Sequence, residues 1–359
     1  MMSNELLVVD SLDPVLVRPA SAVPSPAPAL PSWDAIRVRL TAWEAKFRAA
    51  RSVATLKAVR ADWQVFLGWC EASRVWALPV ASQDLLRFLT DQVVFGKKRS
   101  TLDRYVNTIR LIHKGAGLPD PTHYPDWKLD WQAIVIRLAD LDANAPEQAE
   151  PMRTAHVRQI LASLGDAPLD LRDAALISLA SDTLCRESEL AVLKVENIRR
   201  AGDGWSVDLR RSKTDQAGLG TARYCSPAAK ARLDAWCASA GIERGYLFIP
   251  VGKGRTFTAP PPKERRPLGA VQVARILRRR AVRAGVPGGV LLTGHSGRVG
   301  SAIEMLEAGA TIAEVQFAGG WKSPRMVLHY GKQALAGSNA MAKLRAAQAQ
   351  KEPGEQKED

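Results

Sequence analysis

The sequence predicts a two-domain, mainly α-helical protein with a small antiparallel β-sheet in its C-terminal domain. Three observations support this fold class. The 359 residues exceed what a single hydrophobic core usually organises. Apolar residues recur three and four apart over most of the chain, which is the spacing of amphipathic helices. Two short runs rich in β-forming residues, WSVDLR and TARYC, stand between helical segments and are separated by a polar, Gly-bearing loop.

The N-terminal half is expected to be a helical domain between two irregular segments. Residues 1–32 end in a Pro/Ala tract without periodicity, which predicts a disordered tail. Residues 33–141 keep a helical apolar spacing throughout. Residues 142–153 are polar and carry prolines, which is typical of a linker, and Thr154 is expected to cap the next helix.

Residues 154–345 are expected to form the second domain, with helices around the predicted β-hairpin. The apolar run LFI at 247–249 could add a third strand. Residues 269–285, GAVQVARILRRRAVRAG, return to helical spacing and end at a glycine. The polar residues 346–359 are expected to be flexible.

Composition restricts the class of partner. Lysine and arginine outnumber aspartate and glutamate by 50 to 37, so the formal charge of +13 favours nucleic acid or an anionic surface. The four cysteines lie far apart, which predicts reduced thiols and no metal site. The chain has neither a signal peptide pattern nor an apolar run long enough for a bilayer, so we expect a cytoplasmic protein that associates with the nucleoid and not with a membrane.

Two motifs near the C-terminus could carry chemistry. In GHSGRVG, His295 and Arg298 are three apart and would share one helical face, so both could reach one anion; a solvated face is the ordinary alternative. In AGGWKSPRMVLHY, a Gly-Gly turn, Ser323 as N-cap and Pro324 in the first turn would place Tyr330 on a short helix. The alternative for Tyr330 is a half-buried packing residue.

Two further motifs precede them. DTLCRESEL carries Arg186 and Glu189 at helical spacing after an apolar segment, and a buried arginine requires a carboxylate or a phosphate. A structural Arg186–Glu189 pair is the alternative. RSKT places Lys213 in the loop between the two predicted strands, where its ammonium could reach a ligand; taken alone it is a solvated lysine.

The order and spacing of these motifs resemble the tyrosine recombinase (phage integrase) family, in its Cre-like branch. The resemblance runs from about residue 36 to 345 and includes TLCRESELAVLKVENI, RSKT, GHSGRVG and EAGATIAEVQFAGGW. It implies the catalytic fold of that family and a two-domain clamp around DNA. The family interpretation therefore assigns the helical domain 33–141 to core DNA binding and 154–345 to catalysis.

The resemblance also implies a role for each matched residue. Tyr330 would attack the scissile phosphate and form a 3′-phosphotyrosine. Arg186 and Arg298 would clamp the non-bridging oxygens, because guanidinium geometry suits phosphate. His295 and Trp321 would donate further hydrogen bonds to the phosphate.

Lys213 would protonate the leaving 5′-oxygen, and Glu189 would orient the arginines and His295. The resemblance implies no cofactor and no metal, since cationic side chains supply the charge stabilisation. Two residues depart from the family pattern: Cys185 and Glu187 stand where apolar residues are usual, which we expect to affect only local packing. His329 could act as a base, but adjacent helical residues point to different faces.

Double-stranded DNA is the expected partner. Arginines crowd the helix at 269–285, and GKKRSTLDRYVNTIR resembles a base-reading helix of the family. The expected DNA-binding residues are Lys57, Arg60, Ser100, Thr101, Arg104, Gln272, Arg275, Arg278 and Arg279.

The segment SNAMAKLR at 338–345 resembles the family's docking helix, which implies a homo-tetramer on two DNA sites. Three other functions are open. A topoisomerase and a hairpin telomere resolvase share the chemistry, and a catalytically silent DNA-binding protein would lack it.

Overall fold

The computed structural model describes residues 31–141, 148–209, 220–252, 256–337 and 339–349. It divides into two compact units, Met1–Pro146 and Glu147–Asp359, and the division falls within the expected linker 142–153. The expected fold class is confirmed, because the described residues are mainly helical with one small antiparallel sheet. Among the helices described, none is both long enough and apolar enough to span a membrane.

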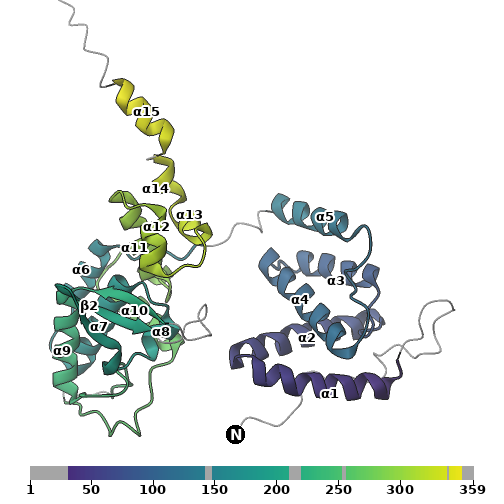
Figure 1. The fold of residues 1–359 in the computed structure, drawn as a ribbon, viewed down its shortest axis with the longest axis horizontal. Helices are drawn as coiled ribbons and strands as arrows, with labels where there is room; N and C mark the ends of the chain where they lie inside the picture. Colours follow the sequence, from purple (N-terminus) through teal and green to yellow (C-terminus); the bar gives the residue numbers. More distant parts are fainter. Residues whose placement is uncertain (1–30, 142–147, 210–219, 253–255, 338, 350–359) are drawn as a thin grey trace, which may run out of the picture. The chain divides into compact units, whose positions relative to one another are not determined.

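The described part of the first unit consists of helices (Figure 1). The two serines that precede the first two helices, Ser32 and Ser52, each accept a hydrogen bond from a first-turn amide. Helix α4 packs against both α1 and α2, and α3 packs against α5. The bounds are α1 Trp33–Ala50, α2 Val53–Ser73, α3 Ser82–Val94, α4 Arg99–Ala116 and α5 Trp127–Asp140.

Aromatic side chains join three of these helices. Phe66 of α2 has its ring centroid 5.4 Å from that of Trp63 and 5.1 Å from that of Phe88 on α3. Phe88 in turn lies 5.4 Å from Tyr105 of α4. Large aromatic rings in offset or edge contact bury much apolar area, so this cluster holds α2, α3 and α4 together.

His113 of α4 is a buried structural histidine. The backbone N–H of Val80 donates to its Nε2 over 3.1 Å, so Nε2 is unprotonated and Nδ1 donates to the carbonyl of Ile109 over 2.8 Å. Burial lowers the pKa of His113 to about 4, against a smaller raising effect of the Ile109 hydrogen bond. The imidazole is therefore neutral in the folded protein at neutral pH.

Stability should depend on pH through His113. The unfolded histidine titrates near 6.5, so the unfolded state binds its proton first as the pH falls. The contribution of neutral His113 to the free energy of unfolding is complete above pH 6.5. It decreases by roughly 3 kcal/mol as the pH falls toward 4. In urea unfolding, the advantage of the wild type over H113Q should therefore narrow from pH 6.5 to 4. A constant difference across this range would contradict the assignment.

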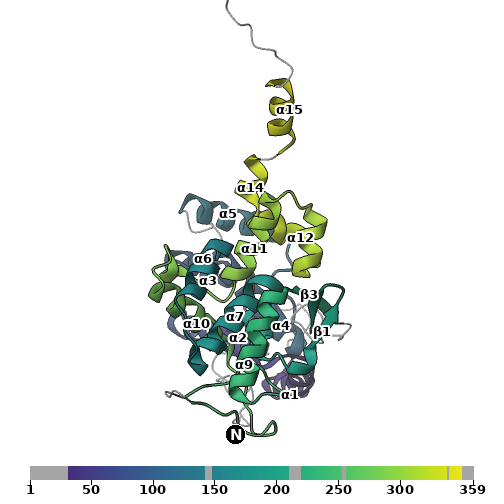
Figure 2. The same ribbon diagram turned by 90° about the vertical axis from the view of Figure 1, so that its left-hand side faces the viewer.

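The second unit surrounds its core with helices (Figure 1). Helix α7 is mostly buried and packs along α9, as Figure 2 also shows. Short 3₁₀ turns occur at Val195–Asn197 and Gly289–Leu291. The helices are α6 Thr154–Ala162, α7 Pro168–Thr183, α8 Glu187–Ala191, α9 Pro227–Ala240, α10 Ala270–Arg283, α11 Ser296–Glu307, α12 Ile312–Gly319, α13 Arg325–Tyr330, α14 Lys332–Gly337 and α15 Ala340–Ala349.

The sheet has three antiparallel strands in the order β1-β2-β3: Ile198–Ala201, Gly204–Leu209 and Thr221–Cys225. The expected hairpin is present as β2 and β3. The expectation that 247–249 adds a strand is wrong, and the third strand is β1, joined to β2 by a two-residue turn whose Gly202 has φ +57°. The 247–249 run is instead buried and irregular, with the amide of Leu247 bonded to Leu193.

Several expected boundaries also shift. Thr154 is the first residue of α6 and not its cap, and both its amide and its hydroxyl donate to Glu304. Met152, expected in the linker, is buried in the core of the second unit. Helix α13 begins at Arg325 after Pro324, and no side-chain cap from Ser323 is present. Helix α15 continues to Ala349, past the expected boundary at 345, whereas residues 1–30, 142–147 and 350–359 lie outside the described part of the chain.

Candidate active site

Arg298 of α11 stands at the centre of the candidate site and is only 2% exposed. Its Nη1 donates to the carbonyl of Leu184, and its Nη2 donates to the carbonyl of Gly319 over 2.8 Å. Its guanidinium also lies 4.1 Å from the ring centroid of Trp321. One side chain therefore connects the ends of α7 and α12 to α11.

Leu184 is held in an unusual backbone conformation. It follows α7 in the left-handed region, with φ +50°, although a leucine side chain disfavours that region. The turn lets its carbonyl accept from Arg298 and brings Arg186 into the site two residues later. Backbone strain of this kind costs about 1–3 kcal/mol and persists only where the surroundings impose it.

Arg186 and Glu189 form the pair that their spacing suggested. The backbone amide of Arg186 donates to Oε2 of Glu189 over 2.8 Å, and its Nη1 donates to Oε1 over 2.6 Å. The two bonds fix the first turn of α8. The side chain of Arg186 remains 15% exposed, so it can contact a ligand while its carboxylate partner holds it.

Arg223 of β3 is a third arginine at the site, which the sequence analysis missed. It is 3% exposed and donates to the carbonyls of Ala318 and Phe317 over 2.8 and 3.4 Å. A Cβ atom at Gly320, which has φ +55°, would lie 2.1 Å from its Nη2. Only glycine fits this approach, so Arg223 and Gly320 together fix the turn before Trp321.

Tyr330 ends α13 and packs edge-on against Trp321, with ring centroids 5.9 Å apart and planes at 65°. Burial raises the pKa of the Tyr330 phenol, while the charges of Arg298 and Arg186 lower it. Both guanidinium groups therefore act on the phenol. The structure thus brings together five residues that the sequence identified: Arg186, Glu189, Arg298, Trp321 and Tyr330.

The site carries an excess of positive charge. Burial first, and then the charges of Arg186 and Arg223, lower the pKa of Arg298 to about 10, whereas Glu189 acts in the opposite direction. Burial likewise lowers the pKa of Arg223. Mutually repelling, partly desolvated guanidinium groups bind an anion with several oxygens well, and a phosphodiester is such an anion.

His295 lies at the start of α11 as its N-cap, with helical backbone angles, and its carbonyl accepts from the amide of Val299 over 3.0 Å. Its Nδ1 lies 3.1 Å from Oε2 of Glu187, and its side chain is 45% exposed. The described contacts of Glu189 are with Arg186, so the carboxylate beside His295 is that of Glu187. Lys213 falls in the segment between β2 and β3 that lies outside the described residues.

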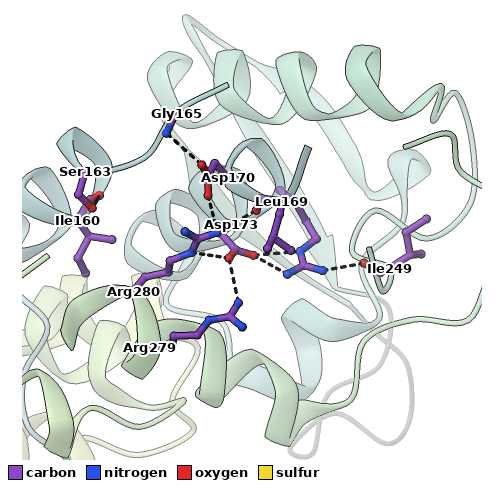
Figure 3. Close-up of polar contacts among 10 residues, drawn as sticks. Ile160, Ser163, Gly165, Leu169, Asp170, Asp173, Ile249, Arg279 and Arg280 are labelled. Atoms are coloured by element: carbon purple, nitrogen blue, oxygen red, sulfur yellow. Dashed lines mark hydrogen bonds and ion pairs between the residues drawn. The ribbon is translucent and has the colours of Figure 1, made fainter. Parts of the chain in front are cut away.

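Asp173 fixes α10 on α7 (Figure 3). This fully buried carboxylate accepts from Arg172 over 2.7 and 3.0 Å and from Nε of Arg280 over 2.6 Å, and Arg279 lies 3.5 Å away. Arg280 also pairs with Asp170 over 2.6 Å. Arg280 is therefore held within the protein and is only 6% exposed, although it belongs to the arginine cluster of this helix.

The other named residues of α10 are exposed. Oε1 of Gln272 accepts from the amide of Gly269 over 2.7 Å and so caps the helix. Nε of Arg278 donates to the carbonyl of Leu292 over 3.1 Å. Arg275 and Arg279 extend the same basic surface, because they lie on the side of α10 away from its buried residues.

In the first unit the named residues lie on α2 and α4, which pack together. Arg104 places its guanidinium on the buried Asp62, with Nε 2.8 and 2.9 Å from the carboxylate oxygens and Nη2 2.8 Å from one of them. Its side chain is still 52% exposed. Lys57, Arg60 and Ser100 are exposed and Thr101 is partly exposed.

Comparisons with known proteins agree with this arrangement. The model of the phage integrase family matches residues 150–335. The chain is 26% identical to the recombinase cre of Escherichia phage P1, over 83% of this chain and 89% of that protein. It is 28% identical to an integrase/recombinase xerD homolog of Selenomonas ruminantium, over 81% and 85%.

Solved structures share the fold. The XerH site-specific recombinase bound to palindromic difH substrate, in a post-cleavage complex, superposes with a TM-score of 0.58 at 12% identity, covering 89% of this chain and 85% of that one. The Tn1549 transposon integrase in complex with circular intermediate DNA gives 0.55 at 16% identity, covering 88% and 99%. Both likenesses concern the fold.

The Asp173 network should be needed for stability. D173N leaves three arginines without their shared carboxylate, and loss of a buried charge partner costs about 3–5 kcal/mol. D170N, at the more exposed partner of Arg280, should cost only about 1 kcal/mol. Urea unfolding of both variants measures the difference, and equal costs would show that Asp173 does not organise this contact.

Proposed function

Because the chain belongs to the phage integrase family of tyrosine recombinases, which are DNA strand transferases, we propose that Tyr330 cleaves DNA through a covalent 3′-phosphotyrosine. The observation that carries the proposal is the position of Tyr330, which packs on Trp321 within the field of two arginines: burial raises the pKa of its phenol, and the charges of Arg298 and Arg186 oppose that rise. The same two arginines that would hold a phosphate thus act on the attacking oxygen.

In the proposed step, Oη of Tyr330 bonds to phosphorus while its proton passes to solvent, and the bond from phosphorus to the 5′-oxygen breaks. Arg186 and Arg298 stabilise the charge that develops on the non-bridging oxygens. Trp321 and His295 donate to the same phosphate. Fixed donors that meet the charge of the transition state need little reorganisation, and the contacts of Arg298 with Leu184 and Gly319 fix it.

Lys213 is the proposed general acid that gives its proton to the leaving 5′-oxygen. Glu189 holds Arg186 through the two bonds already described. Because the phosphotyrosine conserves the energy of the broken bond, the 5′-hydroxyl of a partner strand can attack it and restore DNA without ATP. Two such exchanges, through a Holliday junction, would recombine two Cre-type palindromic sites.

DNA binding is proposed for two surfaces. In the second unit the exposed arginines of α10 would contact bases and phosphates, with Gln272 and Arg275 near the helix start. In the first unit Lys57, Arg60, Ser100, Thr101 and Arg104 would contact DNA from α2 and α4.

Replacing Tyr330 with Phe should abolish the covalent adduct and leave DNA binding unchanged, because only the phenolic oxygen is lost. A suitable substrate is a nicked duplex whose site is selected from a randomised DNA library by binding to Y330F. Gel electrophoresis under denaturing conditions detects the adduct. Y224F is the matched control, since Tyr224 is 62% exposed on β3, and it should form adduct as the wild type does.

The same experiment separates the alternatives. A catalytically silent DNA-binding protein would bind the selected site without forming adduct in the wild type. A hairpin telomere resolvase would form adduct but join the two strands of one end. Adduct formed by Y330F would contradict the assignment of the nucleophile.

We also propose a homo-tetramer on two DNA sites, joined through the C-terminal helix. Met341 and Leu344, three apart on α15, are 58% and 50% exposed, so the helix presents an apolar pair to solvent. A second copy of the chain would cover that pair. This arrangement would couple each active site to its neighbour.

Truncation before Ser338 should leave binding to one half-site nearly unchanged but prevent assembly and exchange. The double variant M341D/L344D keeps the chain length and should fail in the same way, because charges replace the apolar pair. K343A changes the same helix on another face and should behave as the wild type. Gel shifts on one-site and two-site DNA measure both steps; normal two-site complexes from the truncated chain would refute the role of this segment.

A further inference from the structure

Glu187 is the acidic residue at a position where the family pattern is apolar, and it lies against His295. It is the first residue of α8 and follows Arg186 directly. Its Oε2 lies 3.1 Å from Nδ1 of His295, and the two side chains are 25% and 45% exposed. The contact joins α8 to the start of α11, which are separate segments of the unit.

The side chain of Glu187 also packs against the backbone at Gly294. A Cβ atom there would lie 2.7 Å from Cβ of Glu187 and 2.8 Å from both its Cδ and its Oε2. Real Cβ atoms essentially never make non-bonded contacts this short, so the side chain of Glu187 lies directly on the glycine. The Gly294 backbone thus restricts the space that the Glu187 side chain can occupy.

The Glu187 carboxylate is also ionised, and its Oε2 accepts no hydrogen bond from the described residues. The contact with His295 is the largest effect on the pKa of Glu187 and lowers it, with smaller lowering from its own amide and from the charges of His295 and Arg186, against the raising effect of burial. Oε2 is buried, and no aligned donor reaches it among the described residues, since the ring N–H of His295 is within distance but not in line.

Glu187 and Glu189 therefore contact different partners. Glu189 uses both oxygens on Arg186. Glu187 directs an oxygen at Nδ1 of His295. A carboxylate at one imidazole nitrogen fixes the tautomer with the proton on that nitrogen and stabilises the imidazolium, which leaves the other nitrogen to act on the ligand.

We propose that Glu187 is a positioning residue for His295, holding Nδ1–H so that Nε2 faces the phosphate in the strand-cleavage reaction. This rests on the proposed function of the site. Glu187 itself contacts neither the DNA nor the attacking oxygen in this scheme, and it acts only through the imidazole.

The first test needs no DNA. The chain has five histidines, so ¹⁵N-histidine labelling gives few ring signals, and the H295Q variant identifies those of His295. In the wild type His295 should be protonated at Nδ1, whereas E187A should shift it toward the Nε2–H form that a free imidazole prefers. E187Q offers an amide oxygen to Nδ1–H and should keep part of the wild-type form. An unchanged tautomer in E187A overturns the proposal.

The second test is a double-mutant cycle on adduct formation with the selected nicked duplex. E187A should slow cleavage on the order of ten- to a hundredfold, the range for residues that orient a functional histidine, and E187Q should recover part of the rate. E264A, the same change at an exposed glutamate, is the control and should be neutral. In the H295Q background E187A should have no further effect.

The outcomes remain distinguishable. If E187A slows H295Q as much as it slows the wild type, Glu187 does not act through His295 and the proposal is wrong. If the wild type forms no adduct on any selected site, the proposed strand cleavage fails, while the tautomer measurement still decides whether Glu187 positions the imidazole.

Discussion

The arrangement of the catalytic unit depends on the burial of one charged group, the guanidinium of Arg298. Removing such a group from water costs several kcal/mol unless acceptors replace the solvent. The protein supplies the carbonyls of Leu184 and Gly319 and the face of Trp321. To present them, α7 must end in a left-handed turn and α12 must end at a close-packed glycine pair. The positions of Arg186 and Tyr330 follow from those two turns.

Much of the helical fold could be predicted from apolar spacing, and the errors have physical causes. The 247–249 run is apolar because it is buried, but burial alone does not distinguish a strand from an irregular segment whose backbone bonds go to several elements. Strand β1 was not predicted because it is mostly exposed and so lacks an apolar pattern. Three of its four residues are exposed, so IRRA shows no alternation, and its main signal is the Gly-Asp turn that follows.

The candidate site was predictable as a set of positions but not as a set of contacts. The motif order identified Arg186, Arg298 and Tyr330, yet no side-chain pattern reveals that Arg298 is held by backbone carbonyls. Arg223 lies in an ordinary strand sequence and carries no motif. Arg280 could have been separated from its neighbours, because Val273, Ile276 and Leu277 share its buried helical face.

The contact between Glu187 and Gly294 constrains how this lineage can diverge. A Cβ atom at 294 would lie 2.7 Å from the Cβ of Glu187, and every residue except glycine carries a Cβ at position 187. Exchange of the acid for another side chain therefore leaves this collision in place. Descendants can lose the carboxylate while the motif keeps its glycine, so position 187 should vary among close relatives more freely than position 294.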